Sequence, residues 1–276
     1  MKKTTIISLF LMLTVFASCE LDSFLFNDKQ IDKYTLPGNT IPDSHLEMVT
    51  FNSGGNKLYG YWVESNGTRP GLTILYCHGN KHHMDEYWDR VMLLYDLGVN
   101  VFVFDYRGYG LSEGESSESG LYKDGKAALR FIRSEKDVPA DSICLYGYSL
   151  GNVVSIYLAA EKINPLTLVA ESPFASANSL TQGSTVLDLP AKWLTNGEFN
   201  NAEKIKQINT PFLLLHGSDD DFVRYRDNGK VVYRNAPQPK SLRLIAGAAH
   251  NNIPETMGTE QYLATLAGWI NSVTKK

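Results

Sequence analysis

Residues 147–151 have the composition and spacing of a serine nucleophile site. They are Gly-Tyr-Ser-Leu-Gly, which matches the G-x-S-x-G nucleophile elbow, and they lie between an apolar run at 142–146 and a helical pattern at 152–162. A serine in such a turn has strained backbone angles, and the flanking glycines remove side chains that would clash there. The hydroxyl is lifted beside the free N–H groups of a helix N-terminus. We therefore predict that Ser149 is a nucleophile; the alternative is a glycine-punctuated turn with an idle serine.

A serine hydroxyl is a weak nucleophile at neutral pH, so it needs a base that a third group orients. On a sheet with this elbow the partners follow in the order Ser, Asp or Glu, His. Of six histidines, only His216 and His250 follow Ser149, and His216 precedes every aspartate of its own loop. We therefore predict that His250 is the base. The acid belongs to the three adjacent aspartates at 219–221, which cannot all face one imidazole, and the residues alone leave the choice open.

Stabilising an oxyanion requires two backbone N–H groups. One comes from the residue after the nucleophile, Leu150, and the second from the loop after the third strand, here residues 78–82. We predict that the Asn80 amide is this second donor. The neighbouring histidines at 82 and 83 are adjacent on one short loop, where two residues rarely ligate the same ion, and no carboxylate has metal spacing. We therefore expect no metal.

Composition and charge narrow the class of protein. The chain has 276 residues, of which 43% are hydrophobic, enough for one large α/β domain or two small ones. Its net charge is −4, its pI is about 5.9, and it has no basic stripe or RNA-binding signature. Nucleic acid is therefore not expected as a partner.

The N-terminus has the pattern of an export signal. Lysines at positions 2 and 3 precede an apolar stretch at 6–17, which is shorter than the roughly 20 residues that span a bilayer. Residues 16–19, Phe-Ala-Ser-Cys, resemble a bacterial lipoprotein box, although its usual first residue is Leu. We expect residues 1–18 to be a signal peptide and Cys19 to be lipidated, which would anchor the exported protein to a membrane of the bacterial cell envelope. The alternative is an ordinary signal peptide with an incidental cysteine.

Two further cysteines, Cys77 and Cys144, lie within apolar strand patterns. Free cysteine in such a position behaves as a small hydrophobic residue. Although two cysteines of an exported protein can pair, Cys77 lies near the end of its strand and Cys144 lies deeper. We therefore expect no disulfide between them.

Apolar runs and helical patterns alternate along most of the chain, which predicts a parallel sheet with helices on both faces. Strands are expected at 46–51, 58–63, 72–77, 100–105, 142–146, 166–170, 212–216 and 242–245, and helices at 84–97, 119–134, 152–162 and 259–273. The first two strands form a hairpin and predict an antiparallel edge. Residues 19–45 are expected to be the lipidated N-terminus and a tether, and 46–276 the folded domain.

Residues 172–210 interrupt this alternation. They contain two prolines, Pro173 and Pro190, and a helix-like piece near 189–194, and Pro211 follows them directly. Insertions between strands often act as lids over a site. We expect a small lid here, and the alternative is a packing excursion without a functional role.

The residues around these sites resemble a known family, the Bem46-like serine hydrolases of the α/β-hydrolase superfamily, which include eukaryotic ABHD-type members. The resemblance covers about residues 46–272. Residues 105–114, Asp-Tyr-Arg-Gly-Tyr-Gly-Leu-Ser-Glu-Gly, are its most specific match, and 75–80, 147–151 and 211–223 resemble further segments. The last of these implies that Asp220, four residues after His216, is the acid, and His250 matches the histidine of the family.

The resemblance implies the α/β-hydrolase fold, with a mostly parallel eight-stranded sheet. It also implies hydrolysis of a small-molecule acyl substrate, through an acyl-serine intermediate and without a cofactor. A carboxylic ester is the expected substrate, and a thioesterase, protein deacylase or peptidase would use the same residues. A non-catalytic lipoprotein that uses the fold for binding is the alternative of another class, and a complete Ser-Asp-His set in chain order argues against it.

The chain departs from the family pattern at three places. Bulky Lys-His-His at 81–83 replaces small residues, and we expect it to narrow the acyl pocket. Asn152 stands where a second small residue often follows the elbow, and Arg224 replaces the usual proline after Val223. None of these changes removes a predicted catalytic group. Asp105 and Arg107 are expected to order the loop beside the site.

Overall fold

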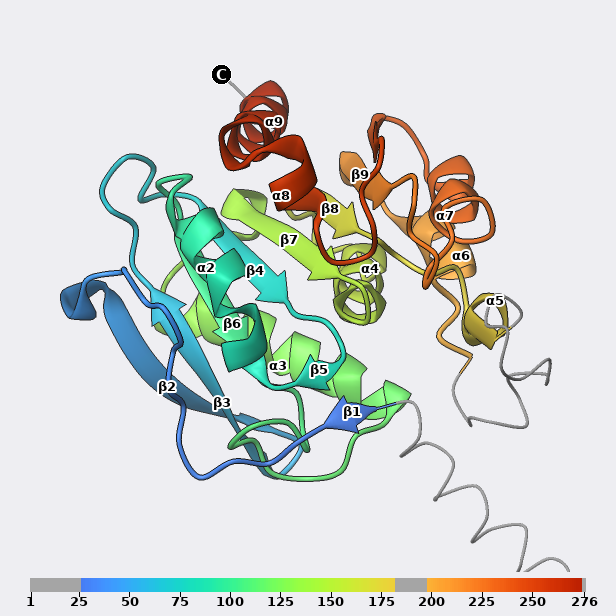
Figure 1. Ribbon diagram of the computed structural model, residues 1–276. Coiled ribbons are helices and arrows are strands. Elements are labelled where there is room, and N and C mark those ends of the chain that lie inside the picture. Colours follow the sequence, from blue (N-terminus) through green and yellow to red (C-terminus); the bar gives the residue numbers. More distant parts are fainter. Residues whose placement is uncertain (1–25, 182–197, 275–276) are drawn as a thin grey trace, which may run out of the picture.

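The computed structural model describes residues 26–181 and 198–274, and its centre is an eight-stranded sheet (Figure 1). The strand order is β10-β9-β8-β7-β4-β6-β3-β2. The strands are β2 (Leu46–Ser53), β3 (Asn56–Val63), β4 (Thr73–Cys77), β6 (Asn100–Phe104), β7 (Ile143–Tyr148), β8 (Thr167–Glu171), β9 (Phe212–Gly217) and β10 (Lys240–Ile245). Only β2–β3 and β3–β6 pair antiparallel, so the predicted parallel sheet with an antiparallel edge is confirmed.

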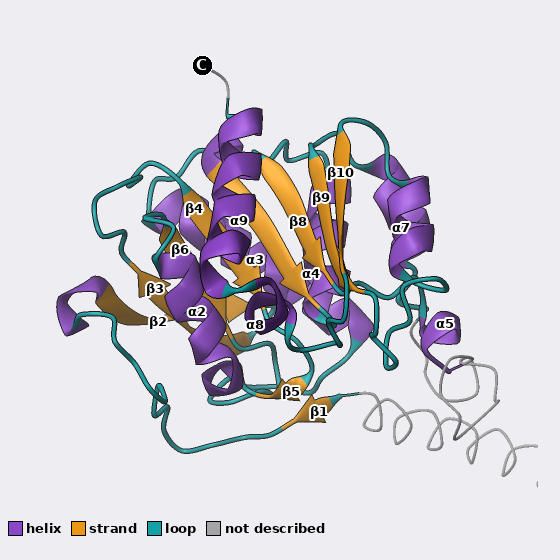
Figure 2. Cartoon of the chain, turned by 45° about the horizontal axis from the view of Figure 1, so that its top comes forward, coloured by secondary structure: helices purple, strands orange, loops and turns teal. Residues whose placement is uncertain are grey.

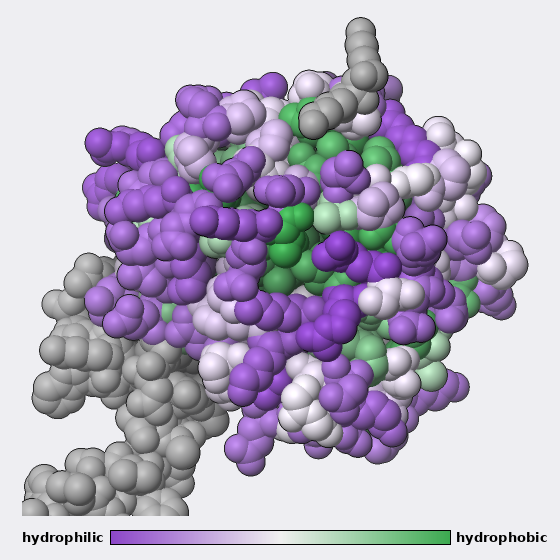
Figure 3. Space-filling view, turned by 180° about the vertical axis from the view of Figure 1, so that it is seen from behind, coloured by the Kyte–Doolittle hydropathy of each residue, from purple (hydrophilic) through white to green (hydrophobic). Residues whose placement is uncertain are grey.

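Helices cover both faces of the sheet, as predicted (Figure 2). One face carries α2 (Trp88–Tyr95), α8 (Ile253–Met257) and α9 (Thr259–Val273), and the other carries α3 (Glu118–Glu135) and α4 (Gly151–Ala160). Successive strand residues point to opposite faces, so Ile74 and Tyr76 join the core under α2 and α9 while Leu75 and Cys77 join the core under α3 and α4. Seen from behind, the largest hydrophobic area lies in the upper centre of a largely hydrophilic surface, with smaller hydrophobic areas toward the lower right (Figure 3).

The two buried cysteines are free, as expected. The register between β4 and β7 places Cys144 opposite Ile74, three residues away from Cys77. The two thiols also belong to different cores, one on each face of the sheet. A disulfide between them is therefore sterically impossible in this fold. Burial raises the pKa of the Cys144 thiol to about 12, so it stays protonated and unreactive at neutral pH.

The first described residues differ from the tether expected over 19–45. Residues 26–45 lie against the domain, where β1 (Asn27–Asp28) pairs with β5 (Lys81–His82) (Figure 1). Phe26, Tyr34 and Ile41 are buried, with at most 5% of their surface exposed. This segment docks because it buries these apolar side chains, which lie too far apart in sequence to form a strand or helix pattern.

Several short elements were not expected from the sequence. They are α5 (Ala177–Thr181), α6 (Asn201–Lys204), α7 (Gly229–Asn235), α8, β1 and β5, each of seven residues or fewer. Helices and strands this short contain too few residues for a periodic pattern of apolar side chains to be recognised in the sequence. The helix-like piece predicted near 189–194 lies outside the described residues. No helix within the described ranges has the length and apolarity needed to cross a membrane.

The turn from β7 into α4 has no spare volume. A Cβ atom on Gly151 would lie 1.9 Å from the backbone oxygen of Cys77 on β4. Backbone of the central sheet cannot move away without breaking its ladder. Glycine at this position is therefore a packing requirement of the fold.

We predict that Gly151→Ala lowers the free energy of unfolding by about 3 kcal/mol or more, because the added methyl group overlaps backbone. Gly268→Ala is the matched control, since Gly268 lies in α9 and its Cβ would have no neighbour within 4 Å. Replacing this helical glycine should raise stability by about 0.5–1 kcal/mol. Urea unfolding of both variants tests the pair, and equal effects would contradict the packing argument.

Candidate active site

Ser149 sits on the elbow in a strained conformation. Its φ is +50°, a left-handed value that residues with a side chain rarely adopt. Its N–H donates to the Glu171 carbonyl at the end of β8 (3.0 Å). The Asn152 amide group donates to the carbonyls of both Ser149 (3.0 Å) and Glu171 (2.8 Å). Asn152, a departure from the family pattern, thus fastens the turn to the neighbouring strand.

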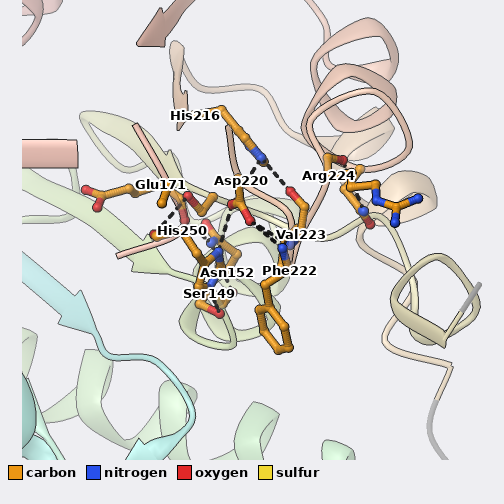
Figure 4. Close-up of polar contacts among 12 residues, drawn as sticks. Ser149, Asn152, Glu171, His216, Asp220, Phe222, Val223, Arg224 and His250 are labelled. Carbon is orange, nitrogen blue, oxygen red and sulfur yellow. Dashed lines mark hydrogen bonds and ion pairs between the residues drawn. The ribbon is translucent and has the colours of Figure 1, made fainter. Parts of the chain in front are cut away.

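The three residues predicted as nucleophile, base and acid lie together (Figure 4). The Ser149 Oγ lies 2.9 Å from Nε2 of His250, and Nδ1 of His250 lies 2.8 Å from Oδ2 of Asp220. A proton on Nδ1 lets the imidazole donate to Asp220 and accept from Ser149. The chain therefore joins residues 149, 220 and 250 into one hydrogen-bonded line.

Asp220 is the aspartate of the 219–221 loop that faces the imidazole. Its side chain is buried, and its Oδ1 accepts the backbone N–H groups of Phe222 (3.2 Å) and Val223 (2.7 Å). Asp219 and Asp221 are exposed. The loop places one carboxylate inward and two in solvent, which is the arrangement implied by the family resemblance.

His216 contacts Asp220 rather than Ser149. Asp220 lies between His250 and His216, whose Nε2 is 3.5 Å from its Oδ2 (Figure 4). The same nitrogen donates to the Val223 carbonyl (2.8 Å). Burial lowers the pKa of His216, so it stays neutral and keeps this donor role. His216 therefore holds the loop that carries Asp220.

Asn80 and Leu150, the predicted oxyanion donors, both line a cavity with Ser149. Leu150 is the N-cap of α4, so its N–H is at the positive end of the helix dipole. The side-chain oxygen of Asn80 accepts the Tyr109 hydroxyl (2.6 Å) and the N–H of Asn27 (2.9 Å). These bonds fix the orientation of the 78–82 loop.

Asp105 and Arg107 order the neighbouring loops, as expected. Asp105 is fully buried and accepts the Met84 N–H (2.7 Å) and the Tyr34 hydroxyl (2.6 Å). Arg107 forms a bidentate ion pair with buried Asp124, in which its Nη2 lies 2.7 Å from Oδ1 and its Nε donates to Oδ2. Bidentate pairs of this kind hold a loop in one geometry.

Two cavities of different chemistry meet at Ser149. The first, of about 80 Å³, is apolar and is lined by Phe26, Asn80, Ser149, Leu150, Phe174, Ala177, Leu180, Phe199, Phe222 and Val223. The second, of about 640 Å³, includes the charged residues Lys81, Glu86, Asp89 and Arg90 together with His250. Ser149, Asn80 and Phe222 border both. The junction at Ser149 therefore separates an apolar space from a polar one.

The expectation that residues 81–83 narrow the acyl pocket is wrong. Lys81 lines the polar cavity, where it pairs with Glu86 (2.5 Å), and neither His82 nor His83 lines either cavity. The side chain of Lys81 is drawn away from the apolar side by this ion pair. Aromatic side chains from four separate segments form the apolar wall instead.

A buried polar cluster under the site was not predicted. The Arg90 guanidinium lies 2.5 Å from Oε2 of Glu171, and the same oxygen accepts the hydroxyls of Tyr146 and Tyr262. Burial and the Glu171 charge raise the pKa of Tyr146, which keeps its hydroxyl protonated as a donor. Arg90 also lies 5.5 Å from the ring centre of Tyr148. Only the polar residue at the end of an apolar strand, Glu171, hinted at this cluster in the sequence.

Within the described residues, no group of three or more His, Cys, Asp or Glu side chains is arranged to hold a metal ion. The groups that lie together at the elbow are the serine, the imidazole, the carboxylate and the backbone N–H groups around them. Such a set can transfer a proton from the serine and stabilise charge on a substrate oxygen.

Comparison with known proteins places the chain among relatives of one superfamily. A family model described as "Serine aminopeptidase, S33" matches residues 68–197. The protein Rv2307c of Mycobacterium tuberculosis is 31% identical over 212 residues, which cover 76% of this chain and 74% of that protein. The alpha/beta hydrolase domain-containing protein aho-3 of Caenorhabditis elegans is 34% identical over 186 residues, 66% of this chain and 53% of that protein.

The fold is also similar to solved structures. The esterase Pf2001 of Pyrococcus furiosus superposes with a TM-score of 0.71 at 20% identity, covering 90% of this chain and 97% of that chain. At this identity the likeness concerns the fold alone. The matched relatives and the eight-stranded sheet with its elbow lead to the same conclusion: this chain belongs to the α/β-hydrolase superfamily.

Proposed function

We propose that the protein is a serine hydrolase that cleaves acyl bonds, most readily carboxylic esters, through an acyl-serine intermediate. The observation that carries the proposal is the hydrogen-bonded line from Ser149 through His250 to Asp220, set on a strained elbow at the junction of two cavities. Such a line activates a serine for attack on a carbonyl carbon.

The proposed steps follow from the geometry. Ser149 attacks the carbonyl carbon while His250 takes its proton, and Asp220 stabilises the imidazolium that forms. The N–H groups of Asn80 and Leu150 bind the oxyanion. His250 then gives the proton to the leaving group, which departs through the polar cavity. Water, activated by the same imidazole, hydrolyses the acyl-serine.

A peptidase is the second candidate, because the matched family model is described as a serine aminopeptidase. Thioesterase and protein deacylase activity would use the same groups. A fold used only for binding is disfavoured, because binding alone does not require a serine, a histidine and an aspartate in hydrogen-bond contact. Hydrolysis rates with p-nitrophenyl esters, thioesters and aminoacyl p-nitroanilides distinguish these substrate classes.

Within the superfamily we place the chain with the Bem46-like, ABHD-type serine hydrolases. The support is the match over residues 105–114 and the elbow itself, and the similarity to aho-3 is compatible with it. Buried Asp105 and the Arg107–Asp124 pair give this segment a structural reason to be shared.

We also propose that residues 1–18 are a signal peptide and that Cys19 is lipidated. The support is the short apolar stretch at 6–17 and the lipoprotein-like residues at 16–19. The protein would then act at the bacterial cell envelope, held to a membrane by its N-terminus.

Ser149→Ala should lower ester hydrolysis by at least about four orders of magnitude, because no other group can form the acyl intermediate. The same variant should not react with a fluorophosphonate probe that labels the wild type. An unchanged thermal midpoint serves as the control for folding. Turnover at the wild-type rate would refute the proposed function.

Asp220→Asn should reduce kcat by about 10³- to 10⁴-fold, because the amide favours the wrong imidazole tautomer. Asp219→Asn and Asp221→Asn are matched controls on the same loop, and we expect changes of less than about twofold because both side chains are exposed. Steady-state kinetics of the three variants test the assignment, which fails if a control is the sensitive position.

Cys19→Ser should release the protein from the membrane fraction, because it removes the residue to which the acyl chains are attached. Several acyl chains anchor a protein far more firmly than one, so their loss should be evident. Mass spectrometry of the mature N-terminus should show a lipid adduct in the wild type only. Ser18→Ala is the control, because it keeps a small residue before the cysteine. A wild type with an unmodified N-terminus would contradict the anchor.

A further inference from the structure

The first described segment of the chain borders both cavities of the site. We call residues 26–36 the N-terminal strap. Phe26 lines the apolar cavity and the next residue, Asn27, lines the polar one. Adjacent residues of an extended segment point in opposite directions, so the strap forms a wall between the two cavities where they meet Ser149.

Backbone bonds attach the strap to the loop that carries a predicted oxyanion donor. The Asn27 N–H donates to the side-chain oxygen of Asn80 (2.9 Å), and Lys29 donates to the carbonyl of His82 (3.2 Å). The parallel pairing of β1 with β5 adds to these contacts. The strap and this loop therefore hold each other in place.

Side chains further along the strap reach buried carboxylates. The Tyr34 hydroxyl donates to Asp105 (2.6 Å), and Thr35 donates to Asp85 through its N–H (2.7 Å) and its hydroxyl (2.9 Å). Bonds to charged groups are the stronger kind. They fix the position of the strap, and hence the position of Phe26, which precedes Tyr34 by eight residues (34 − 26 = 8).

Phe26 is a structural part of the apolar wall. Only 4% of its surface is exposed, and its ring centre lies 6.0 Å from that of Phe199, which lies 6.3 Å from that of Phe174. Aromatic rings whose centres lie at these distances make favourable packing contacts, which hold the Phe26 ring in place. These rings bound the apolar cavity of about 80 Å³, so they narrow the space beside Ser149.

From this arrangement we propose that the N-terminal strap is part of the substrate-binding site and that Phe26 sets the length of the acyl chain accepted. The inference rests on the proposed function and deepens it by naming the substrate class, esters of short acyl chains. A cavity of fixed size excludes longer chains by overlap, whereas each methylene that it can hold changes the rate by about 10-fold or more.

The test is the ratio of kcat/KM for p-nitrophenyl octanoate to that for p-nitrophenyl acetate, measured on protein lacking residues 1–19. Phe26→Ala should raise this ratio at least about 10-fold over the wild type, because removing the ring enlarges the apolar cavity and admits the longer acyl chain. The ratio does not depend on the fraction of enzyme that is folded. Phe26→Trp should lower the corresponding ratio for butanoate over acetate.

Ile41→Ala is the matched control. Ile41 is buried in the same N-terminal segment but does not line either cavity. The Ile41→Ala variant should therefore have the same octanoate-to-acetate ratio of kcat/KM as the wild type. Wild-type ester hydrolysis with unchanged ratios in both Phe26 variants overturns the inference and leaves the proposed function intact. Absence of ester hydrolysis by the wild type overturns both.

Discussion

The geometry around Ser149 depends on the contacts that two neighbouring strands, β4 and β8, make with the turn between β7 and α4. On one side Gly151 lies directly against the Cys77 carbonyl of β4, and on the other Asn152 and Ser149 bond the Glu171 carbonyl of β8. A left-handed serine costs on the order of 1–3 kcal/mol and persists only where its surroundings over-determine it. Here the surroundings are the central strands of the sheet, which are the part of the fold least able to adjust.

Two buried carboxylates, Asp220 and Asp105, organise the loops above this turn, and each divides its two oxygens between different partners. Asp220 uses Oδ1 for the amides of its own loop and Oδ2 for His250. Asp105 likewise uses Oδ1 for the Met84 amide and Oδ2 for Tyr34. A buried charge is costly unless it is fully hydrogen-bonded. Both carboxylates meet that condition by joining segments that are distant in sequence.

Local patterns were sufficient to predict the sheet, the four longest described helices and the pairing of Ser149 with His250, because each of these has a signal within a few residues or in the order of the chain. Asp220 required the family resemblance, since three identical neighbours carry no local difference. The strap, Arg90 and Phe26 were missed for a physical reason. Their partners lie about 50 to 170 positions away, as for Arg90 with Tyr262, and contacts at that separation leave no periodic pattern.

The docked strap also limits how far the apolar cavity could lie from the lipid anchor proposed at Cys19. Phe26 follows Cys19 by seven residues (26 − 19 = 7), and seven residues extend at most about 25 Å. With the lipid proposed at Cys19, the wall of the apolar cavity would stay within that distance of the membrane surface. The maximal extension of this linker is shorter than the thickness of a whole bilayer, which is about 40–45 Å. An enzyme fixed in this way would meet substrate that lies at, or leaves, the surface holding its N-terminus, at the high effective concentration of a short linker.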